Sequence, residues 1–229
     1  MNQSIKRDGF YKIMGIVLLG LVITGFGSAA ISRQENPLDL PIIFHLHAFA
    51  YLGWFTLFIV QASLIGNNKK ALHMKLGQLS VLLVVSMLLT GWVMAQQSFD
   101  RGISPIPDIT IQQFMALPVF DLFSLLVFYS LAVSKRFDPE FHKRAMLITS
   151  IAILDPATAR IGFAIDFAPF PLVASLALLA AIIWHDKRVL GRVHVATWLG
   201  LLWVFLWVGF VFGFATTQQW TNVANALFG

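Results

Sequence analysis

Three ionisable residues lie inside stretches of this chain that are otherwise apolar enough to cross a membrane: Asp121, Asp155 and Arg160. Moving such a side chain into hydrocarbon costs roughly 2.5–3.5 kcal/mol on insertion scales, so it is kept where it is paired or used. Carboxylates and a guanidinium at this depth can hold a cation, a metal ion or a charged substrate. They can equally satisfy one another and fix the packing of helices, and the sequence leaves both interpretations open.

Histidines supply further candidate ligands in the outer half of the same spans. With a rise of about 1.5 Å per residue, Asp121 and Asp155 fall near the middle of the membrane, and His47 falls level with Arg160. One imidazole and two carboxylates suit a divalent ion such as zinc, so His47, Asp121 and Asp155 are candidate metal ligands. His45 lies roughly 200° around the helix from His47, so the two histidines do not readily share one ion.

A polar and aromatic stripe continues from His47 along one face of its helix. Its members recur with the spacing of a single helix face: His47, Tyr51, Trp54, Phe58 and Gln61. We expect this face to point into the protein, because polar groups in lipid need partners. The candidate substrate contacts or structural charge partners of the site are therefore His45, Arg160, Tyr51 and Trp54.

Prolines stand beside both aspartates. Pro118 precedes Asp121 by about one helical turn, and Pro156 directly follows Asp155. Each proline removes a backbone donor and frees a carbonyl, which kinks a helix, and freed carbonyls near a carboxylate help to bind cations in transporters. Arg160 follows Asp155 by five residues, so a direct pair between them requires the kink.

A second candidate site lies at the opposite membrane surface. His73, His142 and His194 each stand where an apolar span begins after a short basic loop. Two imidazoles at equal depth on different helices can ligate a six-coordinate haem b, with its propionates near the neighbouring lysines and arginines. The alternative is that these histidines contact water, carbonyl groups or lipid phosphates.

The elements that carry these residues are predicted from composition. Hydrophobic residues make up 58% of 229 residues, charged residues only 12%, and the mean hydropathy is +0.77. A bilayer core needs spans of about 20 apolar residues. The sequence predicts about seven, near residues 12–31, 42–65, 77–96, 111–133, 144–164, 169–185 and 195–216. We therefore expect an all-α, polytopic transmembrane helical bundle that forms a single domain over residues 1–229, with one leading helix followed by three hairpins. The sixth span is the weakest.

The basic residues predict the orientation. Thirteen of the sixteen lie before the first span or in the loops after the second, fourth and sixth spans; the exceptions are Arg33, Arg101 and Arg160. The positive-inside rule places these loops and the N-terminus in the cytoplasm, and the C-terminus outside. This distribution predicts a partnership with the lipid bilayer and argues against nucleic acid, despite the net charge of +5.

Several short motifs carry a family resemblance. Phe44-His45-Leu46-His47, Leu72-His73-Met74-Lys75, His142-Lys143-Arg144 and Gly191-Arg192-Val193-His194 resemble those of a family of uncharacterised bacterial multi-span membrane proteins. The segments at His73 and His142 are similar, more faintly, to bacterial cytochrome-oxidase assembly proteins and small haem-linked membrane bundles. The resemblance implies a protein of the bacterial inner membrane with a haem or redox connection and a respiratory or other membrane-complex partner.

Three functions are consistent with these residues. The first, favoured by the resemblance, is a haem- or redox-associated membrane protein that uses His73, His142 and His194. The second is a carrier or an intramembrane metal-dependent enzyme built on the buried histidine, aspartate and arginine cluster. The third is a structural or assembly factor. No nucleophile elbow, Walker loop or dinucleotide-binding glycine pattern is present, so whether the chain is an enzyme stays open.

Overall fold

The computed structural model describes residues 9–33 and 40–229, and within them every regular element is a helix. Lys6 and Arg7, which contribute to the predicted orientation, lie outside the described residues. The elements are α1 (Phe10–Arg33), α2 (Ile42–Gly66), α3 (Lys70–Asp100), α4 (Ile111–Ser134), α5 (Pro139–Ala152), α6 (Asp155–Ala164), α7 (Phe170–Leu190), α8 (Val195–Phe212), the short 3-10 helix η2 (Phe214–Thr216) and α9 (Gln218–Phe228).

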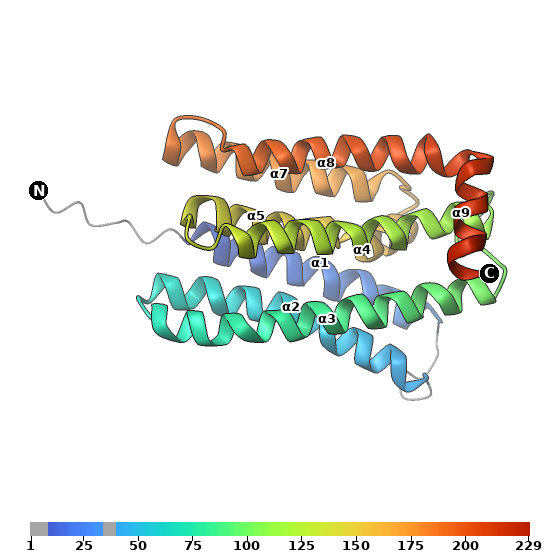
Figure 1. Cartoon of the computed structure of the whole chain (residues 1–229), viewed down its shortest axis with the longest axis horizontal. Helices are drawn as coiled ribbons and strands as arrows, with labels where there is room; N and C mark the ends of the chain where they lie inside the picture. Colours follow the sequence, from blue (N-terminus) through green and yellow to red (C-terminus); the bar gives the residue numbers. More distant parts are fainter. Residues whose placement is uncertain (1–8, 34–39) are drawn as a thin grey trace, which may run out of the picture.

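The long helices run antiparallel in three hairpins behind a leading helix, as the sequence predicts. α2 packs on α3, α4 on α5, and α7 on α8, while α1 packs on α6 and α2. The three hairpin turns and the start of α1 all lie at the left-hand end in Figure 1. We call this the basic end, because its loops carry Lys69, Lys135 and Arg136, and Arg192.

Six of these helices are long and apolar enough to cross a membrane, and the fifth expected span is a broken one. α5 and α6 meet at an angle of 45°, and together they pass the same test. The sixth span, expected to be the weakest, is the continuous 21-residue helix α7. Many large apolar side chains face outward, among them Phe49 at 75% and Phe205 at 69% exposure. A surface of this kind belongs in lipid, and the protein is a membrane protein.

Local sequence signals set the helix ends. Thr110 and Gln113 form a reciprocal capping box at the start of α4. Asp138 accepts hydrogen bonds from the first turn of α5, whose first residue is Pro139. α7 ends at Gly191, which has a φ of 69°, a left-handed conformation that glycine adopts without strain. The last two signals place the turns of the second and third hairpins, and the first sets the start of the second hairpin.

The break between α5 and α6 fixes the position of Asp155, the first residue of α6. Pro156 stands in the first turn of α6, where a backbone N–H has no partner within the helix, so the proline removes no hydrogen bond. α4, in contrast, continues through Pro118 without a break. Gly25 of α1 packs directly on the backbone carbonyl of Ala157 in α6. A side chain at position 25 would clash there, so the small residue holds α6 against the bundle.

α9 is a short amphipathic helix that no apolar span predicts. It lies across the end of the bundle opposite the basic end (Figure 1). The Trp220 indole donates to the Gln112 carbonyl at 2.6 Å, and the Phe228 ring stacks on Trp92 with 4.8 Å between centroids. α9 therefore closes the ends of α3 and α4.

Candidate functional site

The two membrane-embedded aspartates stand on different helices, Asp121 within α4 and Asp155 at the start of α6. Asp121 lies on α4 and is only 7% exposed, and its carboxyl group interacts electrostatically with that of Asp155. Asp121 Oδ1 is buried and accepts no hydrogen bond. Among the described residues no ion pair reaches either carboxyl group. Buried acceptors are normally matched, so within this acidic pair Asp121 Oδ1 is unusual for its depth.

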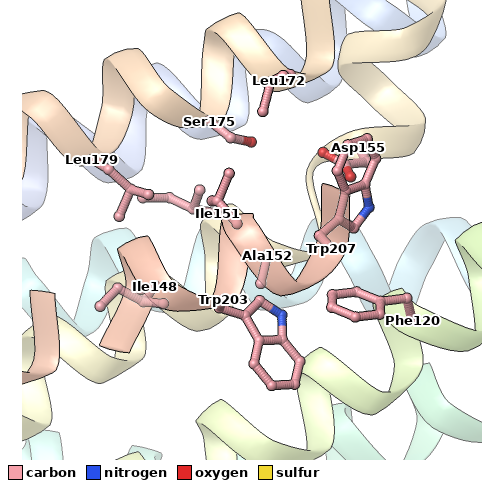
Figure 2. Close-up of a pocket in the computed structure, with 12 residues that line it drawn as sticks. Phe120, Ile148, Ile151, Ala152, Asp155, Leu172, Ser175, Leu179, Trp203 and Trp207 are labelled. Carbon is pink, nitrogen blue, oxygen red and sulfur yellow. The ribbon is translucent and has the colours of Figure 1, made fainter. Parts of the chain in front are cut away.

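A cavity of about 40 Å³ opens beside Asp155. Figure 2 shows the Asp155 carboxyl group, the Ser175 side chain and the Trp207 indole among apolar neighbours from α4, α5, α7 and α8. The Trp207 indole N–H is buried and donates no hydrogen bond. A space of this size holds a water or a small ion where polar groups line it. The polar side chains that line the cavity are therefore the Asp155 carboxyl group and the Ser175 hydroxyl group, beside the Trp207 indole.

His47 and Tyr51 extend this site along α2. Their rings lie 4.3 Å apart, Tyr51 interacts electrostatically with Asp121, and His47 interacts electrostatically with Arg160. His47 Nδ1 is buried and has no hydrogen-bond partner. One ring contact and two electrostatic interactions thus link His47, Tyr51, Asp121 and Asp155, and we call these four residues the outer series after the orientation predicted from the sequence.

Arg160 does not pair with Asp155. Its guanidinium donates to the Pro156 carbonyl at 2.6 Å and lies over the Phe26 ring at 4.3 Å from the centroid. His45, the other histidine in the first half of α2, is half-buried. No group of three or more histidine and acidic side chains within residues 9–33 and 40–229 has the geometry of a metal site. The candidate metal ligands His47, Asp121 and Asp155 therefore do not surround a common point at which one metal ion could bind.

The histidines of the basic end separate into a pair and a single residue. The rings of His73 and His142 lie 6.4 Å apart, edge to face. His142 Nδ1 lies 2.8 Å from the Ala132 carbonyl oxygen, whereas His73 Nδ1 is buried without a partner. His194 instead caps α8, since its Nδ1 accepts from the Ala196 N–H at 3.1 Å. Its ring packs edge-on against Phe141 with 6.0 Å between centroids.

A third buried charge cluster was not predicted from the sequence. Arg144 and Asp186 are both 0% exposed and form an ion pair at 2.6 Å. Arg144 also donates to the Glu140 carbonyl at 2.8 Å. Asp186 accepts from the His194 backbone N–H at 2.9 Å and from the Thr197 hydroxyl at 2.6 Å. Arg144 Nη2 takes part in the ion pair without forming a hydrogen bond. This pair, in which both Asp186 oxygens are matched, joins α5, α7 and the start of α8.

In the sequence Arg144 is one of the basic residues that follow the fourth predicted span, and the sixth predicted span ends at residue 185, just before Asp186. One signal for this pair was present in the sequence, namely an acidic residue where basic residues are expected. Asp186 is an acidic residue immediately before Lys187 and Arg188, at a membrane end that otherwise collects positive charge. One acid in that setting indicates a specific partner.

The comparisons with known proteins add no family or activity. No protein-family model matches the chain, and no curated protein or solved structure is significantly similar to it. Its function therefore has to be inferred from the arrangement of its own residues.

Proposed function

We propose that this membrane protein is a carrier in which the Asp121–Asp155 pair binds a proton or a small monovalent cation within the membrane. The observation that carries the proposal is the unmatched, buried Oδ1 of Asp121 beside a second carboxyl group. Two carboxylates in a medium of low dielectric constant strongly favour taking up a positive charge between them. Intramembrane carboxyl groups of this kind typically mark the routes of protons and ions.

The geometry favours a proton or monovalent cation over zinc. A zinc site needs three or four protein ligands, and the outer series supplies its groups one after another along α2, α4 and α6. The break before α6 supports the carrier, because interrupted helices in transporters present free backbone groups and a helix N-terminus to a bound ion. The nearby cavity has room for the guest or its water.

Transport by purified protein in liposomes tests the proposal. Liposomes containing a trapped pH-sensitive dye or a trapped sodium-sensitive dye receive a potassium diffusion potential, and the two dyes distinguish proton from sodium entry. We expect entry of one of these ions, and Asp121→Asn should abolish it. Asp108→Asn is the matched control, since Asp108 is exposed and asparagine tolerates its positive φ of 63°. Equal rates in Asp121→Asn and the unmodified protein would overturn the proposal.

A haem- or redox-associated role is the second candidate, and the His73–His142 pair supports it. Two imidazoles bound to one metal at about 2 Å each hold their ring centres roughly 6 Å apart, close to the 6.4 Å separation here. The contact of His142 Nδ1 with a backbone carbonyl is the outer contact that orients a ligating histidine. His194 contributes less, because its Nδ1 already caps α8.

An absorption spectrum tests this second candidate. Protein purified from haem-sufficient cells should be red with a Soret band, and His73→Ala and His142→Ala should each remove it while His45→Ala retains it. A colourless preparation would overturn the role in haem binding. A respiratory or other membrane-complex partner follows only from this candidate.

We also propose that the basic end faces the cytoplasm of a bacterial inner membrane and that the C-terminus lies outside, on the strength of the positive-inside rule. The chain contains no cysteine, so single cysteines report their own side. A cysteine at Asn68 should resist a membrane-impermeant maleimide in intact spheroplasts, and one at Asn222 should react. The reverse pattern would overturn the orientation.

A further inference from the structure

We infer that one polar column crosses the bundle along α2, from the outer series to the His73–His142 pair, and that the contact between Trp54 and Ser150 is its closed gate. The inference rests on the proposed function, and it names the carried species as a proton. It joins the two candidate sites into the two halves of a single route.

The polar stripe of α2 supplies the continuity. His47 and Tyr51 belong to the outer series, and the stripe continues inward through Trp54 to Gln61. Gln61 is the backbone neighbour of the His73 ring. One face of one helix therefore carries, in order, a residue that interacts electrostatically with Asp121, a residue at the centre of the bundle and a residue beside the His73 ring.

The inner half contains hydroxyl and imidazole groups that can exchange protons. The hydroxyl groups of Tyr129 and Ser80 lie 2.8 Å apart, one on α4 and the other on α3. Tyr129 packs edge-on against Trp54 with 5.8 Å between ring centroids. Beyond them stand His73 and His142, with Lys70 as the charged neighbour of His73. Arg160 is the charged neighbour at the outer end, beside His47.

Trp54 interrupts the route at the middle of the bundle. It is 1% exposed, and Ser150 is 0% exposed. The indole N–H donates to Ser150 Oγ at 3.0 Å, and Ser150 in turn donates to the Met146 carbonyl at 3.1 Å. An indole is a donor only, so it cannot accept a proton from the acidic pair and pass it on. The structure is thus the closed state of the column.

The transfer balances without a co-reactant. A proton from water on the outer side passes to the acidic pair. When the indole moves aside, the proton passes to the inner hydroxyl and imidazole groups and leaves to water at the basic end. No bond other than O–H and N–H bonds to that proton forms or breaks, and the membrane potential drives the net movement of one positive charge.

Proton entry into the same dye-loaded liposomes tests the gate. Trp54→Phe keeps the ring but removes the donor, and Ser150→Ala removes the acceptor. Each should raise proton entry about tenfold, the factor that corresponds to one buried hydrogen bond. Trp198→Phe is the matched control, because Trp198 is 58% exposed on the lipid-facing side of α8. In the Trp54→Phe background, His73→Asn combined with His142→Asn should return entry to the unmodified rate or below it, and His194→Asn should not.

The outcomes separate the two proposals. If Asp121→Asn blocks entry while Trp54→Phe and Ser150→Ala behave like Trp198→Phe, the gate is overturned and the acidic pair stands. If the histidine double variant leaves entry unchanged, the inner half of the column is overturned. If Asp121→Asn leaves ion entry unchanged, both proposals fail. If neither the unmodified protein nor Trp54→Phe admits protons, the column and its gate are overturned, and the proposed function then stands only on sodium entry.

Discussion

Two buried clusters of charge lie at different depths of this bundle, and they differ in how their polar atoms are matched. At the basic end, Asp186 accepts from Arg144, from a backbone N–H and from a hydroxyl. Nearer the middle, Asp121 Oδ1 accepts no hydrogen bond, and its carboxyl group lies beside that of Asp155. One cluster is arranged to hold opposite charges, and the other brings like charges together.

The difference separates a structural role from a functional one. A buried ion pair with additional hydrogen bonds recovers much of its desolvation cost, and removing one partner leaves an uncompensated charge. The Asp121 carboxyl group, one of whose oxygens accepts no hydrogen bond, recovers less from the resting structure, and a bound guest would supply the compensation that its environment lacks. We expect substitutions in the matched cluster to lower the free energy of unfolding, and substitutions in the unmatched cluster to impair ion binding.

The largest expected effect follows from removing one half of the matched pair. Asp186→Ala leaves the buried Arg144 guanidinium with Glu140 as its remaining acidic partner, and we expect the free energy of unfolding to fall by about 3 kcal/mol, the lower end of the range for a broken buried pair. Unfolding in mixed micelles of increasing denaturing detergent, followed by circular dichroism, measures the change. Asp100→Ala, at the exposed end of α3, is the control. If both variants lose the same small amount, the Arg144–Asp186 cluster does not hold the bundle together.

A smaller effect is expected from a single hydrogen bond to the same aspartate. Thr197→Val preserves shape but removes the hydroxyl that donates to Asp186 at 2.6 Å. The cost should be about 1.5–3 kcal/mol, because the acceptor is charged and buried. Thr90→Val removes only a bond to the carbonyl of Ser86 on its own helix, and it should change stability by less than about 0.5 kcal/mol. Equal losses in the two variants would show that the matched network adds nothing.

The matched cluster should also respond to pH through His194. Burial lowers the pKa of His194 below its usual value of 6.5, and the positive charge of Arg144 adds to this effect. The folded state therefore favours the neutral ring, whose Nδ1 caps α8. Stability is then complete above about pH 6.5 and is lost as the pH falls through the lowered pKa.

The loss should be about 0.5–1 kcal/mol, the value of one partly exposed helix cap. His194→Asn supplies a cap that does not titrate, so its thermal unfolding should vary less between about pH 7.5 and about pH 5 than that of the unmodified protein. An identical pH dependence in both proteins would remove His194 from the cluster's pH response.

The comparison also shows what could be predicted from the sequence. Apolar runs of bilayer length predicted the helices and hairpins, because a span must satisfy its own backbone in lipid. The i, i+4, i+7 pattern from His47 to Gln61 indicated the inward face of α2. The positions of Asp121 and Asp155 followed from counting residues along each span.

Partners across helices could not be predicted in this way. Arg144 and Asp186 are 42 residues apart, and each stands near a basic loop where a charged side chain usually meets water. Only the packing of α5 against α7 and α8 turns them into a buried pair. The Trp54–Ser150 contact joins residues that are 96 positions apart in the sequence, so local residue spacing could not predict it either. Which helices lie side by side in the bundle determines which buried groups find partners, and the spacing of residues along the sequence does not encode that arrangement.

The smallest change in stability is expected from the unmatched cluster. Asp121→Asn keeps the shape of the side chain and removes a charge that has no compensating donor, so we expect the free energy of unfolding to stay within about 1 kcal/mol or to rise. The same variant should lose ion entry in liposomes, so stability and transport move independently. Detergent unfolding and dye-monitored ion entry, measured on one preparation, test this directly. A loss of several kcal/mol, comparable to that of Asp186→Ala, would instead make the acidic pair a structural element like its counterpart at the basic end.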